Sequence, residues 1–395
     1  MRILARRVSL IGLLAAATPF LANAQATLPF TFAPNTPAKA AEVNANFQAL
    51  ANQLPRNVIA VSADPSNPIA SGTALLNALA SITNAAGNVH YVVRLGPGVY
   101  DLGTGTLQMK FNVDVEGSGT QQTVITSTNS DPTQGTVLGP PAGFCASELR
   151  NVTVQNTSIS SGTGVVATSA LCLTNMTINL NGSAGTAYGL RATASTAYLN
   201  QVSITVTPAP AGSGVGILAA SSATLDARNL VILVNGGNSA VGMQMQGSSG
   251  GFMTNVEISA IGAPAATGLQ FTTGAGIIGR NFFVRGETNA ASGTATAVLA
   301  NGNNATNLYG GYFYGAGPTG STRYGVSTSG GGIASLSNVV IEGLTVGVNS
   351  TGTGSNVLLF SSYVNGGIAA SSGGTVFCRG ITADGPVVAG CTNNP

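Results

Sequence analysis

The sequence has little charge and only one histidine. Charged residues make up 7% of its 395 positions, against roughly 25% in an average globular protein. A chain without a basic face is not expected to bind nucleic acid. The single histidine, His90, begins an apolar stretch and has no second ligand nearby in the sequence, so we expect a half-buried strand residue rather than a metal site or a catalytic triad. Phosphate-loop, zinc and nucleophile-elbow motifs are also missing, so we expect no cofactor.

Long apolar runs are missing after the first 24 residues, so we expect no membrane span in the mature chain. Residues 1–24 combine three arginines, an apolar run from Val8 to Phe20 and small residues before a cleavage point after Ala24 or Ala26. This pattern predicts a secretory signal peptide and an extracellular, cell-surface or periplasmic protein. Loss of the three arginines leaves 11 of the 14 basic residues against 12 acidic ones, so the mature chain is nearly neutral.

The chain has four cysteines, and in an exported protein such cysteines favour disulfides. Cys378 and Cys391 would close a short C-terminal loop, whereas Cys145 and Cys172 would join neighbouring repeats. The sequence alone allows three pairings, and it allows free thiols.

Residues 25–56 predict a short amphipathic helix. Thr36 can cap it, Pro37 suits its first turn and Pro55 ends it. The apolar stripe comprises Ala40, Val43, Phe47, Leu50 and Leu54. The stretch PFTFAPNTPAKAAEVNANFQAL resembles an N-terminal element of secreted bacterial and phage tail-fibre-like proteins. So short a helix needs a partner. We consider its own chain or, with a slight preference, sister helices in a homotrimer.

Residues 57–87 predict a linker and a second helix, from Thr73 to Thr83, with Gly87 as a terminator. Its apolar positions are Leu75, Leu76, Leu79 and Ile82. A solenoid must cover the open end of its core, so we expect this helix to cap the first coil.

From Cys145 onward the sequence repeats every 24–30 residues, in two alternating halves. One half, as in LTNMTI and MTNVEI, holds an asparagine, which tolerates the left-handed backbone of a sharp bend. These asparagines are Asn151, Asn175, Asn229, Asn255, Asn281 and Asn338, with Gln201 in the same place in one repeat. We expect them to form a ladder in which Asn255 makes a buried hydrogen bond to Asn229 or Asn281. The other half begins with glycine, as in GLRA, GILA and GMQM.

A repeat of this length with about three short strands and no helix predicts a stacked all-β solenoid. The chain resembles the pectin-lyase-like superfamily, and its opening VVRLGPGVYDLGTGTLQMKFNVDVEGSGTQQTVI looks like the first coils of that family. The resemblance implies a right-handed parallel β-helix of about ten coils over residues 88–395.

Many enzymes of this superfamily place carboxylates on the outward face of one sheet. In the glycine-led half, strand alternation predicts the outward residues Val166, Arg191, Leu218, Gln244, Gln270, Ser327 and Asn349, none of them acidic. The best acid cluster elsewhere is Asp114 with Glu116, which share a strand face near Lys110; a solvated end of the rod explains it as simply as catalysis does. We therefore assign no catalytic residue. Asp226 with Arg228, and Arg285 with Glu287, are expected to form surface pairs.

An outward apolar strip is predicted on the asparagine-bearing half, and such a strip on an exported rod suggests a contact surface or a covering loop. Its members are Tyr198, Phe252, Ile278, Leu359, Phe377, Val231, Phe283 and Val340. The leading hypothesis is a non-catalytic β-helix for adhesion, contact with an extracellular polysaccharide, or assembly. The alternative is a polysaccharide lyase or hydrolase of the same superfamily.

Overall fold

The computed structural model describes residues 29–32, 37, 39–53, 57–86, 89–141, 145, 147–302, 304–387 and 391, without the side chains of residues 48–53. The predicted signal peptide, Thr36 and Leu54 lie outside these residues. The chain divides into two compact units, residues 1–56 and 57–395.

The first unit contains helix α1 (Ala40–Gln53). It begins three residues after the predicted start at Pro37. Asn46 is buried, and both polar atoms of its side chain are satisfied. The side chain accepts a hydrogen bond from the Phe30 backbone nitrogen at 2.9 Å and donates one to the Phe30 carbonyl at 2.7 Å. Phe47, the central residue of the predicted stripe, is 65% exposed. Phe47 is therefore left largely uncovered by the described residues of its own unit.

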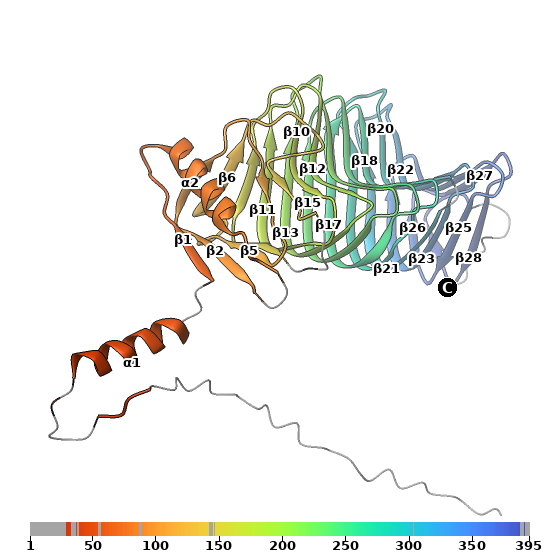
Figure 1. Ribbon diagram of the computed structural model, residues 1–395. Coiled ribbons are helices and arrows are strands. Elements are labelled where there is room, and N and C mark those ends of the chain that lie inside the picture. The colour runs from red at the N-terminus through yellow and green to blue at the C-terminus, as the bar shows by residue number, and fades with distance from the viewer. Residues whose placement is uncertain are drawn as a thin grey trace, which may run out of the picture. The chain divides into compact units, whose positions relative to one another are not determined.

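The second unit begins with helix α2 (Pro68–Ser81), which lies beside the first coils in Figure 1. It starts earlier than the apolar pattern predicts because Asn67 caps it, accepting a hydrogen bond from the Ala70 nitrogen at 3.0 Å, and Pro68 occupies the first turn. Leu75 and Leu79 are buried. The helix packs against strand β3, so closely that a Cβ at Gly72 would meet the carbonyl oxygen of Asp101 at 1.9 Å.

The remainder of this unit is a right-handed parallel β-helix of about ten turns (Figure 1), as the sequence predicts. One sheet carries both strands that flank the asparagine bend, often as one bent strand. Its strands are β1 (Val58–Val61), β2 (Tyr91–Leu95), β3 (Gly98–Asp101), β5 (Val113–Glu116), β6 (Thr123–Ser127), β8 (Glu148–Arg150), β9 (Thr153–Asn156), β11 (Leu171–Asn181), β13 (Thr196–Thr207), β15 (Thr224–Asn235), β17 (Gly250–Ala263), β19 (Ile278–Thr288), β21 (Ala305–Ala316), β23 (Ile333–Gly343), β25 (Asn356–Phe360), β26 (Tyr363–Asn365), β28 (Thr375–Arg379) and β29 (Thr382–Ala383).

The other sheet holds the glycine-led strands. These are β4 (Leu107–Gln108), β7 (Val137–Leu138), β10 (Gly162–Ala167), β12 (Thr186–Thr193), β14 (Ser213–Ala220), β16 (Ser239–Met245), β18 (Ala265–Thr272), β20 (Thr294–Asn301), β22 (Thr322–Ser329), β24 (Val346–Thr351) and β27 (Ile368–Ser371). The residues that alternation predicts to face inward, such as Leu190, Ile217 and Met243, are fully buried. The coil of β20 and β21 is absent from the predicted repeat pattern, because Ala297 replaces the glycine and Gly310 replaces the asparagine.

The bend residues all adopt left-handed backbone angles, from φ 48° at Asn175 to φ 58° at Asn151, and Gly310 does so at φ 64°. Asn255 donates to the Asn229 side-chain oxygen at 3.1 Å, Asn281 donates to Asn255 at 3.0 Å, and Asn175 donates to Asn151 at 2.8 Å. Gly310, which has no side chain, separates Asn338 from these runs. The expectation of buried bonds is wrong, since Asn229, Asn255 and Asn281 lie at an exposed corner of the coil.

Asn255→Leu is expected to lower the free energy of unfolding by about 1–2 kcal/mol. The variant loses two exposed hydrogen bonds and places a γ-branched residue in the left-handed region. Urea unfolding of this variant beside Asn307→Leu measures the effect, because Asn307 lies on the same sheet face with an ordinary strand backbone. Equal stability of the two variants would contradict this role of the bend.

One prediction about outward residues is wrong. Leu359 is fully buried, because it pairs with the inward Leu336; its neighbour Leu358 occupies the outward column. A register error of one residue moves a side chain to the opposite face. In the glycine-led sheet, Val166, Leu218 and Ser327 are buried although they point away from the core.

Candidate functional site

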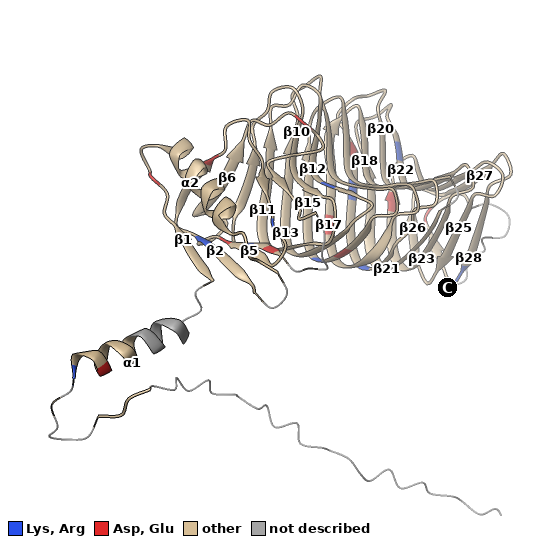
Figure 2. Ribbon diagram, viewed as in Figure 1, with Lys and Arg blue, Asp and Glu red and all other residues tan. Residues whose placement is uncertain are grey.

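Six charged or titratable residues gather on strands β2, β5 and β8 and the residue preceding β2. We call this set, His90, Arg94, Asp114, Glu116, Glu148 and Arg150, the charged cluster. Strand register produces it, since Arg94 pairs with Glu116 and Glu116 pairs with Arg150 on successive parallel strands. Elsewhere on the β-helix, charges are sparse (Figure 2).

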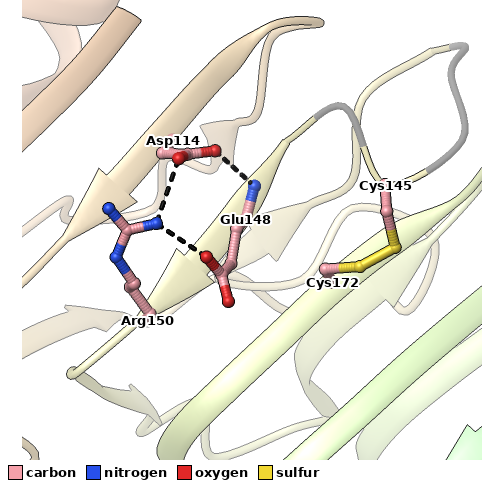
Figure 3. Close-up of a disulfide and its surroundings, with 5 residues drawn as sticks. All are labelled: Asp114, Cys145, Glu148, Arg150 and Cys172. Carbon is pink, nitrogen blue, oxygen red and sulfur yellow. Dashed lines mark hydrogen bonds and ion pairs between the residues drawn. A yellow bond between two sulfur atoms is a disulfide. The ribbon is translucent and has the colours of Figure 1, made fainter. Parts of the chain in front are cut away.

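Arg150 is the centre of the charged cluster (Figure 3). One terminal nitrogen of its guanidinium contacts Asp114 at 3.0 Å and Glu148 at 2.6 Å, and the other contacts Glu116 at 3.5 Å. Asp114 also pairs with His90 Nε2 at 3.1 Å and accepts a hydrogen bond from the Glu148 backbone nitrogen at 2.9 Å. Each of the three carboxylates therefore has a cationic partner.

This pairing is consistent with a guanidinium that stays charged although Arg150 is largely buried. Burial alone lowers the pKa of Arg150, but the hydrogen bonds to Glu148 and Asp114 outweigh it and raise the pKa above its ordinary value. Asp114 and Glu148 contact the same guanidinium nitrogen, so Arg150 bridges the two carboxylates.

A disulfide lies beside the charged cluster (Figure 3). Cys145 and Cys172 are bonded, with Cα atoms 5.4 Å apart, and Cys172 on β11 is the register partner of Glu148. The bond fastens the segment before β8 to the next coil and so positions Glu148. Cys378 and Cys391 form the second disulfide, near the C-terminus, with Cα atoms 4.8 Å apart.

Three members of the charged cluster, His90, Asp114 and Glu148, form with this disulfide one end of a groove with a volume of about 510 Å³. The groove continues over β11, β13 and β15. Its lining residues are His90, Asp114, Cys145, Glu148, Cys172, Thr174, Tyr198, Leu199, Asn200, Asp226 and Arg228. Asp226 and Arg228 were expected to pair, but the structure places no ion pair between these two described residues. Their polar ends are available to a ligand.

The acids of the groove do not form a hydrolytic pair. Glu148 and Asp226 stand in one outward column, separated by Cys172 and Tyr198. Three strand spacings of about 4.8 Å place their backbones about 14 Å apart. Glycoside hydrolysis commonly uses carboxyl groups about 5–10 Å apart. The closer pair, Asp114 and Glu148, is bridged by Arg150.

The structure changes the predicted acid cluster in three ways. Asp114 and Glu116 do share a face, but Lys110 is directed away from them and donates to the Ile82 carbonyl at 2.8 Å, just beyond α2. His90 is about half-buried, as predicted, with 46% of its side chain exposed, but it precedes β2 instead of lying in a strand and is paired with Asp114. Glu148 and Arg150, which complete the cluster, were not selected because they lie more than 30 residues from Asp114 and only the coil register joins them.

Several solved structures have a similar fold. The A-module of a mannuronan C-5 epimerase from Azotobacter vinelandii is 17% identical, with a TM-score of 0.47, over 82% of this chain and 95% of that one. An alginate lyase from Paenibacillus is 12% identical, with a TM-score of 0.40, over 83% and 97%. The catalytic unit of an α-1,3-glucanase from Streptomyces thermodiastaticus is 15% identical, with a TM-score of 0.38, over 85% and 68%.

At these identities the similarity concerns the fold alone. The parallel β-helix that the sequence predicts is shown by the strand pairings of the chain itself. No protein-family model matches the chain, and no curated protein matches it in sequence. Among the described residues, no helix is long and apolar enough to cross a membrane, and no three His, Cys, Asp or Glu side chains are grouped to hold a metal ion.

Proposed function

We propose that the protein is an exported β-helix that binds a neutral polysaccharide in the groove without cleaving it. The observation that carries this proposal is the division of the groove into two parts. At one end the carboxylates are tied to Arg150, whereas further along Asp226 and Arg228 have no ion-pair partner among the described residues. A carboxylate and a guanidinium without ion-pair partners suit the hydroxyl groups of a sugar. The two disulfides support an extracytoplasmic location.

The charges of the groove favour a neutral ligand over an acidic one. Its lining contains the carboxylates of Asp114, Glu148 and Asp226 but only one arginine, Arg228, besides His90. Arg150 is already engaged by three carboxylates. A chain of uronic acids would therefore meet at least as much negative as positive charge, which opposes its binding.

Binding of soluble neutral and acidic glycans, measured by calorimetry, tests this proposal. We expect neutral glucans or mannans to bind more tightly than alginate or polygalacturonate. Arg228→Ala should weaken that binding about tenfold through the lost charged hydrogen bonds. Arg379→Ala is the matched control, because Arg379 is an exposed arginine of the same outward column, far from the groove. Absence of binding to every neutral glycan would overturn the proposal.

The alternative is a lyase-type enzyme, and the pair of His90 with Asp114 favours it. An imidazole oriented by a carboxylate at the rim of a groove resembles a general base with its supporting group. The same glycans separate the two functions, since enzymatic cleavage would release new reducing or unsaturated ends. His90→Gln should then abolish that release while preserving glycan binding.

We also propose that α1 assembles the protein into a homotrimer. Its own rod cannot cover it at Phe252, because β17 lies seven strand spacings, about 34 Å, from β1. Only residues 54–57 join α1 to β1. Even a fully extended linker, together with the helical residues from Phe47 to Gln53, spans at most about 26 Å from β1 to Phe47. This limit holds for any placement of the two units. We therefore propose a sister helix, which carries the same exposed Phe47, as the partner.

Light scattering of the mature protein should give the mass of three chains. Phe47→Asp with Leu50→Asp should dissociate the assembly, because the charges would have to be buried between helices, while the circular dichroism of the strands stays unchanged. Asn44→Asp, which adds charge at an exposed polar position of α1, should leave the mass unaltered. A monomer at micromolar concentration excludes the trimer.

A further inference from the structure

Two exposed faces of the β-helix flank the asparagine ladder at its middle coils. The pre-ladder face comprises Phe252, Ile278, Arg280 and Tyr309, which point outward just before the bend on β17, β19 and β21. The post-ladder face comprises Val231, Glu257, Phe283 and Tyr312, which point outward just after it on β15, β17, β19 and β21. Both faces are unusually apolar for exposed strand surfaces.

The two faces differ in shape. On the pre-ladder face Phe252 is 62% exposed and therefore protrudes, with Ile278 beside it on the next coil. The post-ladder face is hollowed by a groove of about 560 Å³ that includes Val231, Glu257, Phe283 and Tyr312 in its lining. The rings of Phe283 and Tyr312 are stacked, with centroids 5.6 Å apart, and form one wall.

The wall of this groove is held in place from its own chain. The hydroxyl of Tyr312 donates to Glu342 at 2.6 Å, and burial followed by this hydrogen bond raises the pKa of Tyr312 to about 12. The tyrosine therefore stays neutral and fixed over the physiological range. A rigid aromatic wall beside an apolar floor is ready to receive a protruding aromatic side chain with little loss of conformational entropy.

The charges of the two faces are complementary. Arg280 lies on the pre-ladder face and Glu257 on the post-ladder face, one coil apart, so their heights along the rod differ by about 4.8 Å. Neither side chain has an ion-pair partner among the described residues of its own chain. Two such side chains at similar height can meet when a second rod lies alongside in the same direction.

We propose that the pre-ladder face of one copy packs against the post-ladder face of the next copy. Phe252 then enters the groove lined by Val231 and Phe283, and Arg280 pairs with Glu257 of the neighbouring copy. The inference rests on the proposed homotrimer, because helices joined to the rods by residues 54–57 bring the same ends of the rods together. A cyclic trimer requires such a contact between two different faces.

Charge exchange between the two faces tests the proposal in the full mature chain. Glu257→Arg and Arg280→Glu should each weaken association about tenfold or more, measured by sedimentation equilibrium, because each sets like charges opposite one another. The double variant, Glu257→Arg with Arg280→Glu, should restore the wild-type association constant. Arg379→Glu, a reversal at an exposed position outside both faces, should change nothing.

The outcomes separate this inference from the homotrimer itself. A wild-type protein that sediments as a monomer overturns both. A wild-type oligomer that both single variants leave unaltered, or that the double variant fails to restore, overturns the contact between the faces and leaves the helix-based trimer standing. Since Glu257 and Arg280 are exposed, the circular dichroism of the variants should match that of the wild type.

Discussion

Gly242→Ala is expected to lower the free energy of unfolding by about 3 kcal/mol, although alanine adds only one methyl group. A Cβ at Gly242 would lie 2.1 Å from Cγ2 of Ile258 across the core and 2.6 Å from the carbonyl oxygen of Gly268 on the next coil. The second atom belongs to backbone that is paired in the sheet, so it cannot move aside. Overpacking of this kind costs about 1–3 kcal/mol or more.

The chain itself contains the control for this substitution. In the coil of β20 the equivalent residue is Ala297, and the side chain at the position of Ile258 is Phe313, which has no branch at Cβ. Ala297→Gly should therefore cost only about 1 kcal/mol, the ordinary penalty for glycine in a strand. The midpoints of urea unfolding measure both variants. If the Gly242→Ala protein is as stable as the Ala297→Gly protein, steric crowding does not explain why glycine recurs at this position of the glycine-led strands.

Arg150→Met is expected to destabilise the protein by about 2–3 kcal/mol at neutral pH. The substitution keeps much of the side-chain volume but leaves Asp114, Glu116 and Glu148 facing one another without the shared cation. Removing one partner of a buried ion pair costs about 3–5 kcal/mol, and the 24% exposure of the Arg150 side chain reduces that figure. Thermal or urea unfolding gives the loss directly.

The cost of Arg150→Met should fall as salt is added. The repulsion among the three carboxylates is electrostatic, so salt screens it and the difference in unfolding free energy from the wild type should narrow. Arg94→Met is the matched control, because Arg94 is 61% exposed and pairs only with Glu116; its cost should stay below about 0.5 kcal/mol. A difference for Arg150→Met that salt leaves unchanged would point to lost packing instead of charge.

The repeat pattern predicted the fold well because its signals are local. Alternation along each strand identified the buried column that includes Leu190, Ile217 and Met243, and the asparagine positions marked the bends. The pattern missed one coil, because there Ala297 stands in the place of the glycine and Gly310 in the place of the asparagine. It also misplaced Leu359 at the end of the rod, where an error of one residue in register reverses the face.

The candidate site could be predicted only in part. The sequence identified Asp114 and Glu116 because they are two residues apart on one strand. It associated neither with Arg150 or His90, and it associated Lys110 with them although that side chain turns toward α2. Coils of 24–30 residues differ in length through their loops, so the residue that lies above Asp114 cannot be counted along the chain.

The sequence by itself therefore determined the solenoid, its inward and outward columns and the left-handed bends, since each follows from the conformational preferences of a few consecutive residues. The tertiary structure alone decided the charged cluster, the groove beside the Cys145–Cys172 disulfide and the groove walled by Phe283 and Tyr312. These features join residues from different coils, and the stacking of one coil on the next selects which side chains meet.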